Sequence, residues 1–399
     1  MKVLLCATST LPDRMGGGER VLWGLARGLA TQGHEPRILV PKTMRGLPAA
    51  SHHDGVPILR YSDPVHSVST LYLPSLLLAR AAVRTALRDW RPDVIHALQG
   101  ISGLAAVWAG ARPLCYTFHG PWHMEFLEDT VKRHDVPGWM RLTRPLWAPA
   151  KAALVRRIEG AAVRRSDRVV VLSTYSAQQL ASIHRVAGAR VSLIPGGVDL
   201  EHFSPTPDRR AVRESLGLPP QGPLLFTVRR LVPRMGLEGL LQALAAFPGA
   251  TLVIGGEGWI RPRLEEAARA LGVAPRVRFP GFIPEAELPR YYQAADLVVL
   301  PSIALEGFGL ITVEALACGT PVVATPASGA EDVLAPLEPA WLSADTSPAA
   351  VAHAIRAALD RLSADPAIRD RCRAHAVAYS WERMVERYEG LYQSLRRLT

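Results

Sequence analysis

The stretch EGFGLITVEALA carries two glutamates, Glu306 and Glu314, around a Gly-Phe-Gly segment. Because Gly307 and Gly309 fit poorly inside a helix, we expect the helix to begin near Leu310, with the first glutamate in the loop and the second on the second turn. Backbone amides at a helix start can bind hydroxyls or an anion, and a carboxylate beside them can hold a vicinal diol. The spacing therefore predicts two diol-binding acids around an anion site. Either glutamate alone could instead be an acid near the helix start that stabilises the helix by ~0.3–1 kcal/mol through the helix dipole.

Two candidate cations, Arg230 and Arg234, lie in VRRLVPRMG, directly after an apolar run. Phosphate chemistry needs cations, and one charged hydrogen bond contributes about 1.5–3 kcal/mol. Both arginines are therefore candidates for an anion site, although Arg234 could also be a solvated loop residue.

The first half of the chain has its own candidates. Gly16, Gly17 and Gly18 follow the first apolar run, where a glycine-rich helix start can approach a phosphate. Their spacing is not GxGxxG, so a nicotinamide enzyme is disfavoured. His119 ends the run in TFHG, at the edge of a parallel sheet where ligands bind, and His96 in DVIHALQG is a second candidate, for an acceptor. Either histidine could instead be structural.

Apolar runs of strand length alternate with helical patterns along the chain. The first series is KVLLCAT, EPRILV, PDVIHAL, RPLCYTF, DRVVVLS and RVSLIP, and the second is PLLFTVRR, ATLVIGGEG, VRFPGF, LVVLPS and TPVVAT. This alternation is typical of parallel strands covered by helices on both faces, so we predict an α/β fold of two Rossmann-like, doubly wound sheets. The predicted domains are 1–200 and 201–378, and the amphipathic helix at 379–399 is expected to pack back on the first.

The net charge of +10 is unevenly distributed. Residues 1–198 carry 25 Lys and Arg against 13 Asp and Glu, a net charge of +12, and the remainder carries −2. The basic half is expected to meet an anionic acceptor, a membrane surface or nucleic acid, unless it reflects an arginine-rich composition. We find no nucleic-acid-binding motif, so that partner is not expected.

Targeting signals and cysteines restrict the possible class further. The apolar runs are too short or too interrupted to span a bilayer, and the start lacks a signal-peptide core, so we expect a cytoplasmic protein. Cys6, Cys115, Cys318 and Cys372 are far apart and lack metal-ligand spacing, which predicts free thiols.

A basic segment at 131–168 interleaves tryptophans and leucines with arginines. It is consistent with an interfacial helix at the inner face of a membrane, with an acceptor-side lip, or with a core helix that has a solvated arginine face. Trp122, which precedes it, and Arg141 within it are assigned to the acceptor side.

Over nearly its whole length the chain resembles the retaining family 4 glycosyltransferases, which have two Rossmann-like domains in the arrangement called GT-B. The motifs that carry the resemblance occur in a fixed order: IPGGVD, LVPRMG after FTVRR, IGGEG, PGFIPEAELPRYYQAADLVVLPS, and the Glu-x7-Glu element. The resemblance implies a hexosyltransferase whose substrate is a nucleotide-sugar.

The resemblance also implies a role for each candidate residue. Glu314 is expected on the donor ribose, and Glu306 on the hydroxyls of the transferred sugar, with His119 also contacting that sugar. Arg230 is expected on the diphosphate, but the family's second cation, a lysine, is replaced by Met235, and Arg234 could take its place. The remaining expected donor-binding residues are Gly16, Gly17, Gly18, Gly256, Gly281, Phe282, Ile283, Gly307, Phe308, Gly309 and Leu310.

We therefore expect a retaining enzyme that moves a hexosyl unit, most readily from a UDP-sugar, to an acceptor hydroxyl on a glycan, a lipid or a small molecule. No DxD-type pair suited to a metal-bridged diphosphate is apparent, so we expect no metal and no cofactor. An epimerase or hydrolase on the same fold, or a non-catalytic sugar-nucleotide or anionic-surface binder, are the alternatives.

Overall fold

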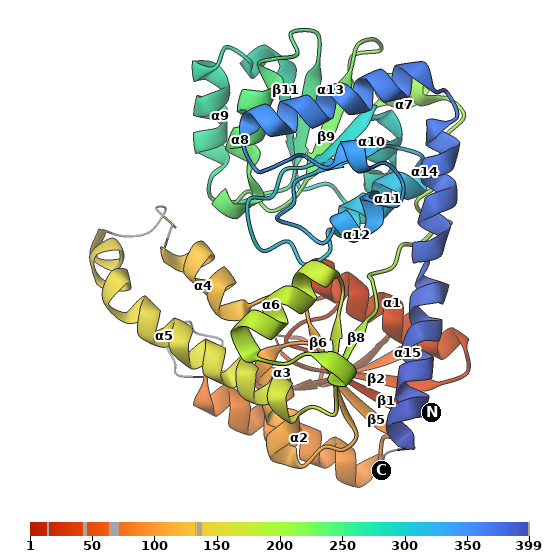
Figure 1. The fold of residues 1–399 in the computed structure, drawn as a ribbon. Coiled ribbons are helices and arrows are strands. Elements are labelled where there is room, and N and C mark those ends of the chain that lie inside the picture. The colour runs from red at the N-terminus through yellow and green to blue at the C-terminus, as the bar shows by residue number, and fades with distance from the viewer. Residues whose placement is uncertain (14–15, 43–45, 64–71, 132, 134–137, 398–399) are drawn as a thin grey trace. The chain divides into compact units, whose positions relative to one another are not determined.

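The computed structural model describes residues 1–13, 16–42, 46–63, 72–131, 133 and 138–397 of the chain (Figure 1). Its contacts divide into two compact units, which we describe separately. Unit 1 comprises Met1–Leu127, Leu142–Gly197 and Trp381–Thr399, and unit 2 comprises Glu128–Arg141 and Val198–Ser380.

Unit 1 is built on an eight-stranded sheet in the order β3-β4-β2-β1-β5-β6-β7-β8. All neighbouring strands are parallel except β3 and β4, which form an antiparallel edge hairpin. The strands are β1 Lys2–Cys6, β2 Glu35–Pro41, β3 Ala50–His53, β4 Val56–Tyr61, β5 Val94–Ala97, β6 Leu114–Phe118, β7 Arg168–Val171 and β8 Val191–Leu193. All six strands predicted in this half are present, and the hairpin was not predicted.

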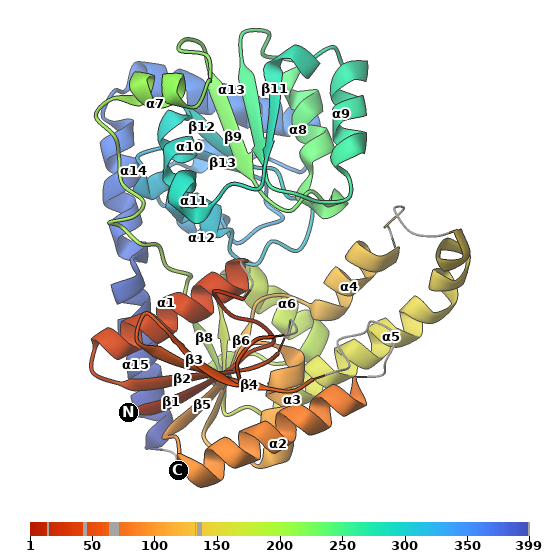
Figure 2. The ribbon, with the colours of Figure 1, turned by 180° about the vertical axis from the view of Figure 1, so that it is seen from behind.

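Helices cover this sheet on both faces, with α1 and α15 on one face and α2 and α3 on the other (Figures 1 and 2). The helices of the first half of the chain and the C-terminal helix are α1 Gly17–Thr31, α2 Leu73–Asp89, α3 Gly100–Ala109, α4 Trp122–Val131, α5 Gly138–Arg165, α6 Thr174–His184 and α15 Trp381–Arg396. This placement follows from right-handed crossovers between parallel strands that run outward in both directions from β1.

Glycines on α1 let the C-terminal helix approach closely. A Cβ atom at Gly24 would lie 2.6 Å from the Trp381 ring, and one at Gly28 would lie 2.4 Å from Cγ2 of Val385. The apolar face of α15 is buried, including Tyr388 and Tyr392, so the last helix completes the core of unit 1.

Unit 2 contains a five-stranded parallel sheet in the order β11-β10-β9-β12-β13. All of its strands except the edge strand β11 are nearly continuous apolar runs, as expected for a sheet covered on both faces. They are β9 Leu224–Val228, β10 Thr251–Gly255, β11 Val277–Gly281, β12 Leu297–Leu300 and β13 Val322–Ala324. The helices are α7 Arg209–Ser215, α8 Leu237–Leu244, α9 Arg261–Ala270, α10 Leu288–Ala294, α11 Leu310–Ala317, α12 Glu331–Leu334, α13 Pro348–Ala364 and α14 Ile368–Ala376.

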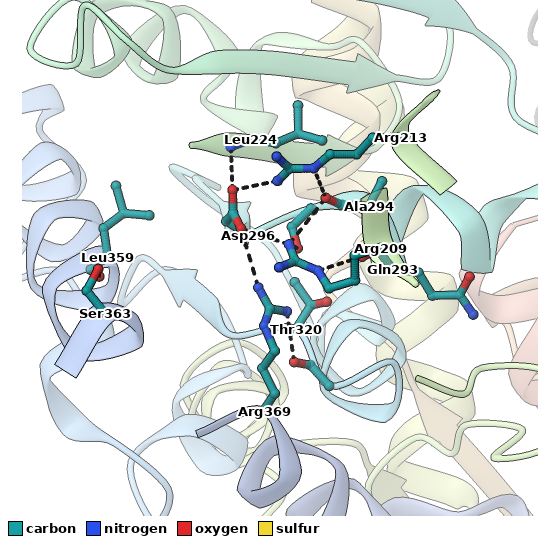
Figure 3. A network of polar contacts seen from close by, with 12 residues as sticks. Arg209, Arg213, Leu224, Gln293, Ala294, Asp296, Thr320, Leu359, Ser363 and Arg369 are labelled. Atoms are coloured by element: carbon teal, nitrogen blue, oxygen red, sulfur yellow. Dashed lines mark hydrogen bonds and ion pairs between the residues drawn. The ribbon is translucent and has the colours of Figure 1, made fainter. Parts of the chain in front are cut away.

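At the amino edge of this sheet, three arginines converge on Asp296, the residue before β12 (Figure 3). Arg209 and Arg213 of α7 donate to its two carboxylate oxygens at 2.7 and 2.6 Å, and Arg369 of α14 lies at 3.5 Å. The backbone amide of Leu224 donates a further bond of 2.8 Å. Burial raises the pKa of Asp296, but the arginines outweigh this effect, so the pKa lies below its ordinary value. This network ties two helices to the starts of β9 and β12.

The predicted α/β fold of two doubly wound parallel sheets is confirmed. All four cysteines are free and buried, as predicted. Among the helices described, none is both long and apolar enough to cross a membrane.

Candidate functional site

The Glu306 loop lies at the carboxyl edge of the unit 2 sheet, between β12 and α11. Gly309 precedes α11 with φ of 78°, a left-handed conformation that suits glycine, and a Cβ atom there would lie 2.9 Å from Cδ2 of Leu300. The helix begins at Leu310, as predicted. The loop is held from the other side by the amide of Gly329, which donates to the Glu306 carbonyl at 2.9 Å. Glu306 is therefore placed in an ordered loop rather than in the helix.

Arg229, a residue that the sequence analysis did not select, pairs with Glu306. Its Nη2 donates to Oε2 of Glu306, and Oγ of Ser302 donates to the same oxygen at 3.3 Å. The side chain of Arg229 is only 5% exposed, whereas that of Arg230 is 53% exposed. Successive residues leaving a strand point to opposite sides, so one arginine turns inward and the next outward. In the sequence, the two adjacent arginines after β9 were the only indication of this pair. The alternating direction of their side chains determines which of the two reaches Glu306.

Arg234 is buried, which excludes the alternative that it is a solvated loop arginine. It lies in the short 3-10 turn Pro233–Met235 and donates from Nη1 to the carbonyl of Leu305 at 3.2 Å. Gly236 lets this turn approach the loop, since a Cβ atom there would lie 1.8 Å from the carbonyl oxygen of Pro301. Arg234 thus holds the residue next to Glu306. Met235 is buried as well, so the position of the family's lysine is part of the apolar core.

These charges influence one another. Burial lowers the pKa of Arg229, the Glu306 carboxylate opposes that shift, and the charge of Arg234 adds to it. The cluster therefore holds two buried cations near one carboxylate. This excess of positive charge favours the binding of a second anion nearby.

Glu314 is 3% exposed and lies on α11 beneath α10. The hydroxyl of Tyr292 on α10 donates to its Oε2 at 2.6 Å. This bond fixes the carboxylate inside unit 2. Its expected contact with a donor ribose stays a prediction.

The glycines of IGGEG allow close packing at the same edge. Gly256 has φ of 106°, and a Cβ atom there would lie 1.9 Å from the carbonyl oxygen of Arg229. Gly281, with φ of 81°, accepts at its carbonyl from the amide of Gly256 at 2.7 Å. The next residue, Phe282, is 56% exposed, whereas Ile283 is buried. A Cβ atom on Gly255 would lie 2.5 Å from Cδ1 of Ile283. Phe282 is therefore open to a ligand, and the Ile283 side chain serves packing.

The Gly-Phe-Gly segment is anchored by its aromatic side chain. Phe308 is 3% exposed, and its ring centroid lies 6.4 Å from that of Tyr379. Gly307 and Leu310 flank it at intermediate burial. The predicted use of backbone amides from this segment is not tested by these contacts.

In unit 1, the glycine triplet and His119 come together around a carboxylate. Glu19 in the first turn of α1 accepts a hydrogen bond from Oγ of Ser9, and its charge raises the pKa of His119. Burial has the larger, opposite effect and lowers that pKa to about 4, so the imidazole is neutral near pH 7. A Cβ atom on Gly16 would lie 2.5 Å from Oε2 of Glu19. A carboxylate thus already lies at this helix start, which weighs against the phosphate expected at Gly16, Gly17 and Gly18.

The structure corrects the expectation for His96. It is fully buried, with Nδ1 2.6 Å from the hydroxyl of Tyr392 and Nε2 2.7 Å from Oγ1 of Thr117. Burial and the charge of His119 lower its pKa to about 3. With both ring nitrogens bonded inside the core, His96 joins β5 and β6 to α15 and is not available to an acceptor.

Trp122 is half-buried at the start of α4. Its ring centroid lies 5.3 Å from that of Tyr72, and its backbone amide donates to Glu159 at 3.4 Å. These contacts do not test an acceptor-side role. Arg141 falls among the positions whose side chains the structure does not describe.

Comparison with known proteins agrees with this architecture. The model of the family described as Glycosyltransferase Family 4 matches residues 15–202, and that of Glycosyl transferases group 1 matches residues 208–376. D-inositol 3-phosphate glycosyltransferase 2 of Catenulispora acidiphila is 30% identical over 389 residues, covering 92% of this chain and 87% of that protein. The enzyme of Mycobacterium marinum described as D-inositol 3-phosphate glycosyltransferase is 35% identical over 241 residues, and the match spans about half of its length, 51%.

Solved structures share the fold. Sucrose-phosphate synthase from Thermosynechococcus elongatus superposes with a TM-score of 0.80 at 24% identity, covering 100% of both chains. Anabaena HepE in complex with UDP-glucose superposes with a TM-score of 0.72 at 20% identity, over 99% of this chain and 100% of that one. The two family models and the relatives that align over most of their length show that this chain belongs to the family 4 glycosyltransferases, with the GT-B fold.

Proposed function

We propose that this enzyme transfers a hexosyl unit, with retention of configuration, from a nucleoside diphosphate sugar to an acceptor hydroxyl. The observation that carries the proposal is the cluster of Arg229, Arg234 and Glu306 at the carboxyl edge of the unit 2 sheet. In doubly wound sheets ligands bind at this edge. The cluster supplies a carboxylate for sugar hydroxyls, and the exposed Arg230 beside it supplies positive charge for a diphosphate.

The reaction needs little covalent participation from the protein. The bond between the anomeric carbon and the donor diphosphate breaks, a bond to the acceptor oxygen forms on the same face, and the acceptor proton passes to the released diphosphate. Glu306 orients the transferred sugar, Glu314 holds the ribose, and the neutral His119 can accept or donate a hydrogen bond to a sugar hydroxyl. Catalysis then depends on orientation and on charge stabilisation of the leaving group.

We propose that Arg230 and the backbone amides at the start of α11, rather than a metal ion, stabilise the leaving diphosphate. Fixed guanidinium groups can supply the charge that a magnesium ion supplies in other transferases. Activity should therefore persist in EDTA and gain nothing from added magnesium or manganese. Loss of turnover in EDTA that is restored by one of these ions would contradict this part of the proposal.

We propose a UDP-sugar as donor and a polyhydroxylated, anionic small molecule as the first acceptor to test. HepE was solved with UDP-glucose, and the related enzymes are named for D-inositol 3-phosphate. The net charge of +12 on residues 1–198 favours an acceptor that carries a phosphate. A lipid-linked acceptor is the second candidate, because α5 exposes Leu142 and Leu146 to 79% and 81%. A core helix that exposes only an arginine face to solvent would bury these leucines.

The decisive experiment measures product formation from UDP-glucose, UDP-N-acetylglucosamine, ADP-glucose and GDP-mannose, each with and without inositol phosphate or an extract of cell lipids. Acceptor-dependent release of the nucleotide, with an anomer-retaining product by NMR, is the expected result. Sugar release that no acceptor accelerates would favour the hydrolase alternative. Tight donor binding without turnover under any condition would favour a sugar-nucleotide sensor.

A further inference from the structure

Arg229 and Arg234 bind two successive residues, Leu305 and Glu306, of the loop between β12 and α11. Arg229 binds the carboxylate of Glu306 itself, and Arg234 binds the carbonyl of the preceding Leu305 at 3.2 Å. Leu305 has φ of 60°, a strained value for a residue other than glycine, so the backbone here depends on such external contacts. The two arginines come from the segment after β9, and the loop comes from the segment after β12.

The bonding of Arg229 is incomplete. Its Nε and Nη1 are buried and, among the residues described, have no hydrogen-bond partner, although the side chain is only 5% exposed. Buried charged groups are almost always fully bonded, because a buried N–H group without a partner is costly. A side chain retained in this state is better explained by function than by stability.

The Asp296 network shows what a purely structural arginine cluster looks like in the same unit. Arg213 donates from Nε to the Ala294 carbonyl at 2.8 Å, from Nη1 to the Gly222 carbonyl at 3.1 Å, and from Nη2 to Asp296. Arg209 likewise reaches the carbonyls of Gln293, Ala294 and Ala295. At the amino edge, the arginine N–H groups that do not bond to Asp296 therefore donate to backbone carbonyls. Arg229, in contrast, donates only to the carboxylate of Glu306 within the part of the chain that the structure describes.

We propose that Arg229 is a positioning residue for Glu306: with Arg234 it forms a clamp that holds the carboxylate in the orientation needed to bind the transferred sugar. The proposal rests on the proposed function and deepens it. It also reassigns Arg234, which the sequence analysis placed on the diphosphate, to the support of the Glu306 loop. A direct contact between Arg229 and the diphosphate is the competing role.

A double-mutant cycle separates these roles. The variants Arg229→Met, Glu306→Gln and the double variant are compared with wild type for kcat with UDP-glucose and for affinity for UDP alone. If Arg229 acts through Glu306, each single change should lower kcat by about 100-fold, the scale of one lost transition-state contact, and the double variant should be no slower than Glu306→Gln. UDP, which lacks the sugar, should bind all variants like wild type.

Two further variants guard against trivial explanations. Arg229→Lys keeps the charge and should recover part of kcat, and Arg278→Met removes an exposed arginine of β11 and should change nothing. Melting temperatures check that Arg229→Met is folded. If it is not, the cycle is measured between Arg229→Lys and Glu306→Gln instead, with the same expectation of non-additive loss.

The outcomes are distinct. Additive losses in kcat, or a fall in UDP affinity that matches the fall in kcat/KM, would overturn the clamp and favour the diphosphate role. Unchanged kcat in Arg229→Met would overturn both. A wild-type protein that neither binds UDP nor turns over any nucleotide-sugar would instead defeat the proposed function, and the clamp with it.

Discussion

Two arginine clusters lie at opposite edges of the unit 2 sheet and use the same chemistry differently. At the amino edge, Arg209, Arg213 and Arg369 surround Asp296 and complete their bonding with backbone carbonyls (Figure 3). At the carboxyl edge, Arg229 and Arg234 lie beside Glu306, and Arg229 keeps buried N–H groups without partners. We infer that the fully bonded cluster contributes to stability and that the incompletely bonded one has a role in function.

The largest effect is expected from removing the acid of the satisfied cluster. Asp296→Ala leaves three arginines without their common partner, which should lower the free energy of unfolding by about 3 kcal/mol, the lower end for breaking a buried ion pair, since Asp296 is partly accessible. Urea unfolding followed by circular dichroism measures this. The exposed Asp370→Ala on α14 is the control and should change little. Equal stability of the two variants would refute the structural role of the Asp296 network.

The next effect concerns the acid of the incomplete cluster. Glu306→Gln should reduce kcat at least about 100-fold, because the proposed contact to the transferred sugar in the transition state would be lost, while the melting temperature hardly changes. Steady-state kinetics with a saturating donor and a thermal melt measure the two quantities. Glu266→Gln, an exposed change on α9, is the control. If Glu306→Gln turned over like wild type, the assignment of the carboxyl edge as the active site would be wrong.

A change at Glu314 tests whether the site includes the carboxylate that Tyr292 of α10 holds in place. Glu314→Gln should weaken donor binding by about tenfold, equivalent to ~1.4 kcal/mol, with a smaller change in kcat, because the proposed contact to the donor ribose would be lost equally from the ground state and the transition state. Isothermal titration with UDP measures this. Tyr292→Phe, which removes the hydroxyl that holds the carboxylate, should act in the same direction and less strongly. Wild-type affinity in both variants would mean that Glu314 serves packing alone.

The smallest effect is a change in stability at the incomplete cluster. Arg229→Met should alter the free energy of unfolding by less than about 1 kcal/mol, because the buried guanidinium that is lost is only partly bonded and the Glu306 carboxylate keeps its hydrogen bond from Ser302. The same urea series gives the value beside that for Asp296→Ala. A loss as large as that of Asp296→Ala would mean that both clusters serve stability, and the contrast between the two edges would disappear.

Local patterns were sufficient for the strands and for the start of α11. Short apolar runs predicted eleven of the thirteen strands found among the described residues, because a buried parallel strand must be apolar on both faces. Gly309 marked the helix start, because its left-handed backbone suits glycine. The β3–β4 hairpin was missed although Asp54 and Gly55, both at positive φ, form a dipeptide typical of tight hairpins.

Charged and polar candidates were harder to place, because their surroundings come from distant parts of the chain. His96 follows the pattern of a strand-end ligand, yet Tyr392, almost 300 positions away, takes one of its nitrogens. Arg234 looks like a loop residue, yet the β12–α11 loop buries it. Two adjacent arginines after β9 could not be distinguished until the packing showed which one turned inward.

The sequence by itself determined the α/β class, all strands except the β3–β4 hairpin, the family and the two acids of the Glu-x7-Glu element, because these depend on hydrophobic period, glycine geometry and spacing along the chain. Only the tertiary structure decided that Arg229 holds Glu306, that the charge of Glu19 acts on His119, and that His96 belongs to the core. The physical reason is that the charge and bonding state of a polar side chain depend on which groups share its low-dielectric surroundings, and those groups meet only when the chain is folded.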